Sequence, residues 1–234
     1  MAKVAVDLRN MRKSYNEDEQ LLLESSLPSK NPILLFQHWF EEAKNCETIY
    51  ESNAVCLSTC DKDGWPSSRM VLLKSFGDDG FKFFTNYDSR KGKELIENPK
   101  AALLFYWDPL KRQIRVEGLV EKLPESEAEE YFRLRPKRSQ IAAAISNQSE
   151  VIESRDELIK RYSLLDERYS GDEFIPKPSF WGGFKLVPKS IEFWQGQSSR
   201  LHDRILFKRS QNTAVDGTLV KEAENGWVMQ RLQP

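Results

Sequence analysis

The sequence contains few of the residues that build metal sites and disulfide frameworks. Its 234 residues include three cysteines and two histidines. No two cysteines form a C-x-x-C pair, and His38 and His202 lie far apart along the chain. A metal site would need ligands scattered over the sequence, and three cysteines do not make a disulfide framework. We therefore expect no bound metal, and we expect Cys56 and Cys60 to pack as small apolar groups on one face of a strand.

Long apolar runs are also missing. The longest uninterrupted run covers residues 101–107, whereas a membrane-spanning helix needs about 20 apolar residues. The first residues lack the apolar core of a secretory signal, so we expect a cytoplasmic protein with no membrane partner. Lysine and arginine number 35 against 36 acidic residues. This balance leaves no continuous basic face for nucleic acid, and any anion site must come from a local cluster.

Three common ligand-binding and catalytic motifs are absent as well. The chain has no G-x-G-x-x-G, no G-x-x-x-x-G-K-[ST] and no G-x-S-x-G. These absences argue against a dinucleotide-binding Rossmann unit, a P-loop nucleotide site and an α/β-hydrolase.

The sequence does contain the pattern of an antiparallel sheet with flanking helices. Asn31 and Pro32 open a helix whose apolar residues recur at helical spacing. Because strands precede and follow a helical insert without β-α-β alternation, we expect a mainly β fold, an all-β barrel core that carries helices. Residues 1–30 are expected to form a flexible segment and residues 31–234 a single domain. Strands are predicted at 54–60, 68–75, 81–85, 101–107, 113–122, 184–186, 190–194, 204–209 and 227–232, helices at 89–98 and within 124–169, and a loop at 210–225.

Two basic clusters in the first half of the chain suit a phosphate. Arg69 and Lys74 are an odd number of residues apart, so a regular strand would point them to opposite faces, toward two different anions. The alternative is a pair of edge charges on a buried strand. Arg90 and Lys91 fall in the first turn of a helix whose cap lies at 88–89, where free backbone N–H groups and two cations converge. A bound phosphate fits there, and a solvated helix face is the alternative.

Two further clusters occur in the second half. Tyr131 and Arg135 are four residues apart on one helical face, and Ser139 follows a break at Pro136 that can turn it back toward them. A phenol, a guanidinium and a hydroxyl suit a phosphate monoester, and an exposed basic helix end is the alternative. Residues 191–204 join a tryptophan, two arginines and a histidine around a glycine turn. This set suits a planar anionic heteroaromatic ring, although a lone histidine is more often structural.

The segment IEFWQGQSSRLHDR at 191–204 resembles the C-terminal signature of the pyridoxine (pyridoxamine) 5′-phosphate oxidases, which are FMN enzymes of vitamin B6 metabolism. Other blocks resemble that family in the same order. They are MRKSY at 11–15, SSRMVLLK at 67–74, FFTNYDSRKGKEL at 83–95, FYWDPLKRQIRVEG at 105–118, YFRLRPKRSQI at 131–141, SNQS at 146–149 and the terminal QRLQP. The similarity covers nearly the whole chain from residue 11.

This resemblance implies an FMN-binding split β-barrel and a homodimer with two flavins at the subunit interface. It also implies the reaction, in which pyridoxine 5′-phosphate and pyridoxamine 5′-phosphate are oxidised to pyridoxal 5′-phosphate. In our hypothesis the substrate 4′ carbon passes a hydride to flavin N5, and dioxygen then reoxidises the flavin and yields hydrogen peroxide. Two phosphate clamps would hold the flavin and the substrate face to face.

The matching motifs assign roles to individual residues. Arg200 and His202 are the catalytic candidates: both align the substrate, His202 is expected to assist proton removal from the 4′ oxygen or nitrogen, and which matters more stays open. The flavin site is matched by Arg69, Met70, Val71, Leu72, Phe84, Thr85, Arg90, Lys91, Gln113, Gln148, Ser149, Trp194 and Arg204. The substrate site is matched by Lys74, Tyr131, Arg135 and Ser139 at the phosphate, and by Arg200, Leu201 and His202 beside the pyridine ring. Arg12 and Tyr15 match residues that close over the substrate, as a lid on the N-terminal segment.

Three other functions compete with this one. A flavin reductase that uses a nicotinamide would keep the barrel, but it has no use for the substrate-phosphate residues. A carrier of pyridoxal phosphate would use the same pocket without turnover, but it gains nothing from Gln113, Gln148 and Trp194. A nucleic-acid-binding module needs a continuous basic face, which the acidic run near 125–130 interrupts.

Overall fold

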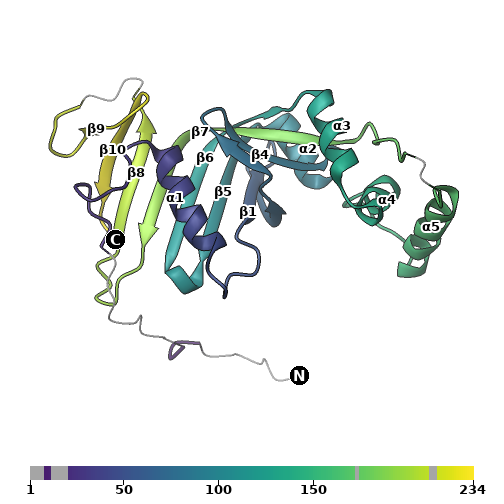
Figure 1. Cartoon of the computed structure of the whole chain (residues 1–234), viewed down its shortest axis with the longest axis horizontal. Helices are drawn as coiled ribbons and strands as arrows, with labels where there is room; N and C mark the ends of the chain where they lie inside the picture. Colours follow the sequence, from purple (N-terminus) through teal and green to yellow (C-terminus); the bar gives the residue numbers. More distant parts are fainter. Residues whose placement is uncertain (1–7, 12–20, 172–173, 211–214) are drawn as a thin grey trace.

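The computed structural model describes residues 8–11, 21–171, 174–210 and 215–234 (Figure 1). Within these ranges an antiparallel sheet forms the centre, and helices lie along it and at one end. The helices are α1 (Pro32–Lys44), α2 (Arg90–Glu97), α3 (Glu125–Leu134), α4 (Lys137–Ile145), α5 (Arg155–Arg168) and the 3-10 helix η1 (Asp108–Leu110). The strands are β1 (Ala54–Cys60), β2 (Pro66–Leu72), β3 (Ser75–Gly77), β4 (Gly80–Asn86), β5 (Lys100–Trp107), β6 (Arg112–Lys122), β7 (Trp181–Gln195), β8 (Asp203–Arg209), β9 (Lys221–Glu222) and β10 (Trp227–Leu232).

β7 is the strand that organises the sheet. The order of the strands is β2-β1-β5-β6-β7-β8-β10-β9, and β6 pairs along almost the whole length of β7. On the other side of β7, residues 181–186 pair with β4, and residues 190–195 pair with β8. One long strand therefore joins two groups of strands, with β4 and β3 at its start and β8 and β10 at its end.

The strands β2, β1, β5, β6, β7 and β4 form an incomplete barrel. β2 and β4 are the two edges of this group, and no strand ladder joins them within the described residues. One backbone hydrogen bond crosses at the seam, from the N–H of Lys74 to the carbonyl of Lys82 at 2.9 Å. The predicted mainly β fold with flanking helices is confirmed, and the barrel is open along this seam, as a split β-barrel is.

The sequence prediction was wrong about β7. It places two strands at 184–186 and 190–194, with Pro188, which has no N–H for a ladder, between them. The structure has one strand through both. The pairing with β6 has a β-bulge at this point: Lys189 is an extra residue on β7, and Gly118 of β6 lies opposite Pro188. A Cβ at position 118 would collide with the carbonyl of Val187, so glycine permits the close approach that keeps the strand continuous.

Two smaller differences lie at turns. The strand predicted at 68–75 stops pairing with β1 after Leu72, because Lys74 already bonds across to Lys82 of β4, and the separate strand β3 follows. The loop predicted at 210–225 contains the two-residue strand β9, which pairs with β10. The other predicted helices and strands are present with bounds shifted by a few residues.

The main core lies between the sheet and α1, which begins where predicted with the side chain of Asn31 as its N-cap. Phe36 on α1 is fully buried, and its ring packs edge-on against Phe81 of β4 with centroids 5.0 Å apart. Trp39, about one turn further on, packs edge-on against Phe193 of β7 at 5.2 Å. Aromatic pairs of this kind add to the burial of their area, so α1 fixes β4 and β7 relative to each other.

The two ends of the molecule differ (Figure 1). At one end α3, α4 and α5 gather around the start of β7. The buried members of the apolar cluster there are Phe132, Ile141, Ile175 and Trp181. At the other end the sheet continues as β8 and β10, and residues 21–24 of the segment expected to be flexible lie on it, with Leu22 buried and its N–H donating to Asp203. No helix in the described part of the chain is long and apolar enough to cross a membrane.

Candidate active site

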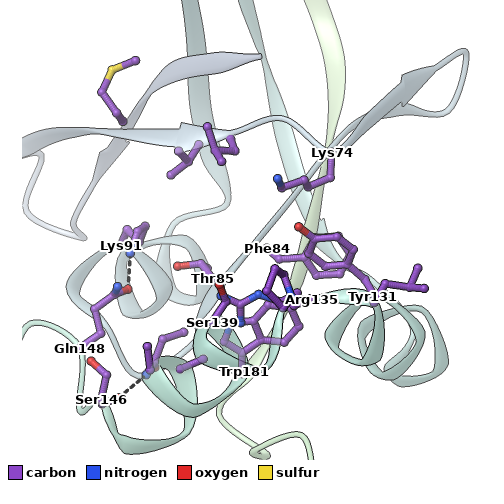
Figure 2. A pocket seen from close by; sticks show the side chains of 18 residues that line it. Lys74, Phe84, Thr85, Lys91, Tyr131, Arg135, Ser139, Ser146, Gln148 and Trp181 are labelled. Atoms are coloured by element: carbon purple, nitrogen blue, oxygen red, sulfur yellow. Dashed lines mark hydrogen bonds between the residues drawn. The ribbon is translucent and has the colours of Figure 1, made fainter. Parts of the chain in front are cut away.

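A cavity of about 570 Å³ opens between the barrel and the helical end of the molecule (Figure 2). β2 and β4 form one wall, and α3, α4 and the start of β7 form another. Eleven residues that the sequence assigns to the site line this cavity: Met70, Val71, Leu72, Lys74, Phe84, Thr85, Lys91, Tyr131, Arg135, Ser139 and Gln148. The lining is completed by Asn86, Leu134, Pro136, Ala142, Ala143, Ser146 and Trp181.

Lys74, Tyr131, Arg135 and Ser139 meet on one side of this cavity (Figure 2). α3 ends just before Arg135, and Pro136 starts α4, so the break in the helix turns Ser139 back toward Tyr131 and Arg135 as predicted. The Nζ of Lys74, which follows β2, lies 5.7 Å from the centre of the Tyr131 ring. The structure thus joins four side chains from three elements into one cluster of two cations and two hydroxyls.

Arg135 carries a positive charge that no described carboxylate balances. Its guanidinium lies 4.9 Å from the centre of the Trp181 ring. The Nη1 atom is buried, and in the described part of the chain it has no hydrogen-bond partner. Burial lowers the pKa of Arg135, which reflects the cost of holding the charge away from water. A phosphate would supply both the missing negative charge and the missing acceptor.

The wall formed by β2 and β4 suits a flat ring system. Met70 on β2 keeps 62% of its surface exposed, which is a large apolar area left open on this wall. Phe84 on β4 stacks on Tyr131 with ring centres 4.3 Å apart and on Trp181 at 5.4 Å. Apolar and aromatic walls with a few polar groups are typical of small-molecule sites.

Lys91 lies in the first turn of α2 and faces Gln148. Its Nζ donates to Oε1 of Gln148 at 2.6 Å and to Oγ of Ser89 at 3.3 Å. Ser89, and not Asp88, caps α2, because its Oγ accepts an N–H of the first turn. Burial and then the charge of Arg69 lower the pKa of Lys91 to about 8. A partly buried cation at a helix N-terminus is unfavourable for two reasons: it loses hydration, and it opposes the helix dipole. An anion bound there would reduce both costs.

Arg69 and Arg90 do not line the main cavity, because both bond to Glu94. Glu94 is 5% exposed and accepts hydrogen bonds from Oγ of Ser67 at 2.6 Å, from Nε of Arg90 at 2.8 Å, and from Thr59. Burial alone would raise the pKa of Glu94, but the hydrogen bonds from Ser67, Thr59 and Arg90 lower it to about 2. This carboxylate therefore fixes both arginines behind the wall of the cavity. Arg69 and Lys74 do point to different places, but the predicted alternation along one strand is not the reason, because β2 ends at Leu72 and Lys74 lies beyond it.

Six predicted site residues lie at the far end of β7: Gln113, Trp194, Arg200, Leu201, His202 and Arg204. Gln113 of β6 and Arg204 of β8 pair with Trp194 from either side. The rings of Trp194 and His202 have centres 4.8 Å apart. Arg200 has φ 69°, a left-handed conformation that only a few per cent of residues other than glycine adopt.

These two groups of residues do not form one site within a single chain. Trp181, which lines the cavity, and Trp194 stand at opposite ends of β7. A strand rises about 3.3 Å per residue, so about 40 Å of strand separates them. Ser149 lies next to Gln148 in a neighbouring cleft beside α2. Arg12 and Tyr15 fall outside the described residues, and their assignment stays a prediction.

The sequence analysis missed two residues of this site. Trp181 packs between Arg135 and Phe84 in the cavity wall, but it precedes the strand predicted at 184–186 and lies in none of the blocks that carry the resemblance. The glycine that follows it, Gly182, is a signal, because any Cβ there would collide with a tyrosine ring. Glu94 was missed because its partners Ser67 and Thr59 are distant from it in sequence. Its local signal is the spacing of four residues from Arg90, which places the two side chains on one face of a helix.

Comparison with known proteins relates this arrangement to one family. Residues 41–165 match the family model described as pyridoxamine 5′-phosphate oxidase, and residues 181–234 match the pyridoxine 5′-phosphate oxidase C-terminal dimerisation region. The chain is 54% identical to pyridoxine-5′-phosphate oxidase of Bos taurus, over 98% of this chain and 88% of that protein. It is 48% identical to pyridoxine/pyridoxamine 5′-phosphate oxidase of Nostoc punctiforme, over the full length of both.

Solved structures agree with the sequence matches. PhzG from Burkholderia lata 383, solved with tetrahydrophenazine-1-carboxylic acid, is 30% identical and superposes with a TM-score of 0.80, covering 94% of this chain and 100% of that chain. A pyridoxamine 5′-phosphate oxidase-related FMN-binding protein from Nostoc punctiforme is 14% identical with a TM-score of 0.63, over 85% of this chain and 97% of that chain, and shares the fold. With matches along both halves and nearly full-length identity near one half, the chain belongs to the pyridoxine/pyridoxamine 5′-phosphate oxidase family.

Proposed function

We propose that this chain is an FMN-dependent oxidase that converts pyridoxine 5′-phosphate and pyridoxamine 5′-phosphate to pyridoxal 5′-phosphate. Its relatives at about half identity carry the names of this activity. The observation that carries the proposal is the cluster of Lys74, Tyr131, Arg135 and Ser139 at one point of the cavity. Two unbalanced cations and two hydroxyls suit a phosphate monoester, which both substrates carry.

FMN fits the side of the cavity that β2, β4 and α2 form. Lys91 and the N-terminus of α2 would bind its phosphate, with Arg69 and Arg90 adding positive charge from behind. The fit rests on the position of Lys91, which lines the cavity in the first turn of α2, beside the backbone N–H groups of the helix start. The apolar wall around Met70 and Phe84 would contact the ring system. When bound, FMN supplies the hydride acceptor for the substrate 4′ carbon.

A homodimer completes the site. Residues 181–234 match the dimerisation region of the family, and a two-fold dimer uses the same surface on both subunits. Because one chain does not bring the two ends of β7 together, we infer that the partner subunit's Trp194, the partner subunit's Arg200 and the partner subunit's His202 complete the cavity. Gln113 and Arg204 lie with this group and would come from the partner too. Each chain would then contribute to two sites.

The protein's contribution to the reaction is orientation. Lys74 and Arg135 would hold the substrate phosphate, while the hydroxyls of Tyr131 and Ser139 fix its rotation. Arg200, beside the pyridine ring, would align the ring so that the 4′ carbon faces the flavin, where it gives up a hydride while the 4′ oxygen or nitrogen loses a proton. Stacked aromatic rings around Phe84 exclude water from this side of the cavity.

Anaerobic mixing tests the proposal. Pyridoxine 5′-phosphate is added without oxygen to the FMN-loaded protein while the visible flavin absorbance is followed, and air is then admitted. We expect the absorbance to bleach and to recover in air, with formation of pyridoxal phosphate and one equivalent of hydrogen peroxide. A yellow protein that bleaches with neither phosphate substrate contradicts the oxidase function. Bleaching with a reduced nicotinamide instead would indicate a flavin reductase, and binding of pyridoxal phosphate without FMN would indicate a carrier.

Two further properties belong to the same proposal. We propose that residues 31–234 fold as a single unit, which limited proteolysis would show as one protected fragment. We propose the cytoplasm as the location, which cell fractionation tests.

A further inference from the structure

The loop between β7 and β8 carries both Arg200 and His202, and Gln197 holds it together. The backbone N–H of Gln197 donates to Nδ1 of His202 at 3.0 Å. Its carbonyl accepts from the N–H of Arg200 at 3.2 Å. Its side-chain Nε2 donates to Oδ2 of Asp203 at 2.8 Å, and the Gln197 residue is 2% exposed. One buried residue therefore bonds to both catalytic candidates and to the first residue of β8.

Asp203 gives this loop its anchor. It is 8% exposed, and its Oδ2 also accepts from the N–H of Leu22 at 3.1 Å. Its Oδ1 accepts from Nη1 of Arg231 on β10 at 2.6 Å, and Arg231 bonds further to Glu24 at 2.7 Å. Two segments distant in sequence, at Leu22 and on β10, thus hold one carboxylate, and this carboxylate holds the side chain of Gln197.

These bonds determine where the neutral imidazole of His202 carries its proton. A nitrogen that accepts from a backbone N–H has its lone pair occupied and bears no hydrogen, so in the neutral ring the hydrogen is on Nε2. The Trp194 ring, 4.8 Å away, limits rotation of the imidazole. Burial and the charge of Arg200 lower the pKa of His202 against the opposing effect of Asp203, which favours the neutral ring.

We propose that Gln197, held by Asp203, is a positioning residue that locks His202 as its Nε2–H tautomer, so that His202 donates a hydrogen bond to an oxygen atom of the substrate. This revises the expectation that His202 removes a proton, because neither ring nitrogen offers an open lone pair in this arrangement. The inference rests on the proposed function for the identity of the ligand. The tautomer itself is a property of the chain and is measurable without turnover.

Gln197 also constrains the backbone conformation of Arg200. A left-handed backbone at a residue other than glycine is strained and persists only where its surroundings hold it. The bond from the Arg200 N–H to the Gln197 carbonyl closes the turn that imposes φ 69°. Loosening Gln197 is therefore expected to disturb Arg200 and His202 together.

Nitrogen NMR of the FMN-loaded protein, labelled with ¹⁵N-histidine, tests the proposal. The chain has two histidines, and a His38→Gln variant assigns their signals. At pH 8 we expect His202 to show one tautomer, with hydrogen on Nε2. In Gln197→Met, which keeps the length of the side chain but removes the bond to the Asp203 carboxylate, we expect averaging between the two tautomers and a fall in kcat of about 12- to 150-fold, the effect of one hydrogen bond to a charged group. Gln37→Met, an exposed glutamine on α1, is the matched control and should change neither.

A second pair of variants separates donation from proton removal. Gln at position 202 places an N–H donor near the position of Nε2, so His202→Gln should retain about tenfold more kcat than His202→Ala. Asp203→Asn is the independent variant for the anchor, and it should reproduce the averaging seen in Gln197→Met.

Several results would overturn the proposal. They are hydrogen on Nδ1 in the wild type, a protonated ring at pH 8, an unchanged tautomer and kcat in Gln197→Met, or equal losses in His202→Gln and His202→Ala. A locked Nε2–H tautomer in a holoprotein that oxidises neither substrate would support the positioning role of Gln197 and contradict the proposed function, so the two failures are distinguishable.

Discussion

The positively charged side chains at the two ends of β7 differ in whether they are paired with carboxylates. At the cavity end, Lys74 and Arg135 form no salt bridge within the described residues, and a nitrogen of Arg135 is buried without a partner. At the other end, Arg204 pairs with Glu192 at 2.8 Å, and Arg231 pairs with Asp203 at 2.6 Å. Paired charges hold a scaffold, whereas an unpaired buried cation is costly until a ligand arrives. The contrast indicates that the cavity end receives the phosphate and that the other end presents a preformed surface to the partner subunit.

The largest expected effect is at the scaffolded end. Arg200→Ala should lower kcat by about 10²- to 10³-fold, the usual loss when one transition-state donor is removed. FMN should stay bound, because Arg200 is assigned to the pyridine ring and the variant leaves Lys91 and the cavity wall unchanged. Steady-state kinetics and flavin absorbance after gel filtration measure the two effects. Unchanged turnover would remove Arg200 from the mechanism, and loss of flavin would show that Arg200 supports the flavin as well as the substrate.

Mixing two variants tests whether the ends meet across a dimer. Arg135→Ala and Arg200→Ala damage different ends, so a mixed dimer contains one site with both defects and one intact site. Random exchange of subunits makes half of the dimers mixed, and activity should recover to about a quarter of the wild-type value. The measurement is activity after denaturation and refolding of an equal mixture. Recovery no greater than in each variant refolded alone would place both ends in the site of one chain.

Arg69→Ala tests whether this arginine contributes to FMN binding at the cavity end. A hydrogen bond to a charged group contributes about 1.5–3 kcal/mol, so the dissociation constant for FMN should rise about 10- to 150-fold. Fluorescence titration of the apoprotein with FMN measures this constant, and excess FMN should restore most of the turnover. Lys62→Ala, at an exposed turn far from the cavity lining, is the control. An unaltered affinity for FMN would contradict the role of Arg69.

Glu94→Gln tests a buried charge network behind the wall of the cavity. The pKa of Glu94 is about 2 in the folded chain against an ordinary value of 4.5, so its contribution to stability is present above pH 4.5 and is lost as the pH falls toward 2. We expect the variant to lose about 3 kcal/mol at pH 7, and the gap from the wild type to close near pH 2. Urea unfolding at several pH values measures it. Glu97→Gln, exposed on the same helix, is the control. A gap that is the same at pH 7 and pH 2.5 contradicts the assignment.

The smallest effect concerns the two helix caps at the cavity end. Ser89 caps α2 and is fully buried, whereas Ser154 caps α5, a helix with no buried residue. Ser89→Ala should lower the free energy of unfolding by about 1 kcal/mol and weaken FMN binding, since the cap orders the N–H groups of the first turn. Ser154→Ala should change global stability by less than about 0.5 kcal/mol. Equal effects of the two variants would indicate that α2 is no more firmly integrated than α5.

Much of the fold follows from local patterns. β1 is predicted over its observed residues, 54–60, because alternation within a strand needs no knowledge of its partners. β7 is not predicted as one strand, because its continuity through Pro188 depends on Gly118, which lies opposite Pro188 and 70 residues earlier in sequence. Pairing of this kind is set by register between strands, and a single stretch of sequence does not contain it.

The candidate site divides in the same way. Tyr131, Arg135 and Ser139 are predicted as a group because one helix and one proline break bring them together. Glu94 is not, since the hydroxyls that hold it come from β1 and β2. The resemblance to a family identifies the site residues at both ends of β7, but it does not show that these two groups of residues lie far apart within one chain. That separation appears only once the length of β7 is known.

The position of β7 late in the chain has a consequence for synthesis. The edges of β4 and β6 have no partner until residues 181–195 have left the ribosome, because β7 closes both. The pair Phe81 and Leu186 closes a loop of about a hundred residues, and such long-range contacts form slowly. Until then the nascent chain exposes two unpaired strand edges, which other chains can join. A ribosome that stalls before β7 therefore leaves a chain with two open strand edges, which is prone to aggregation.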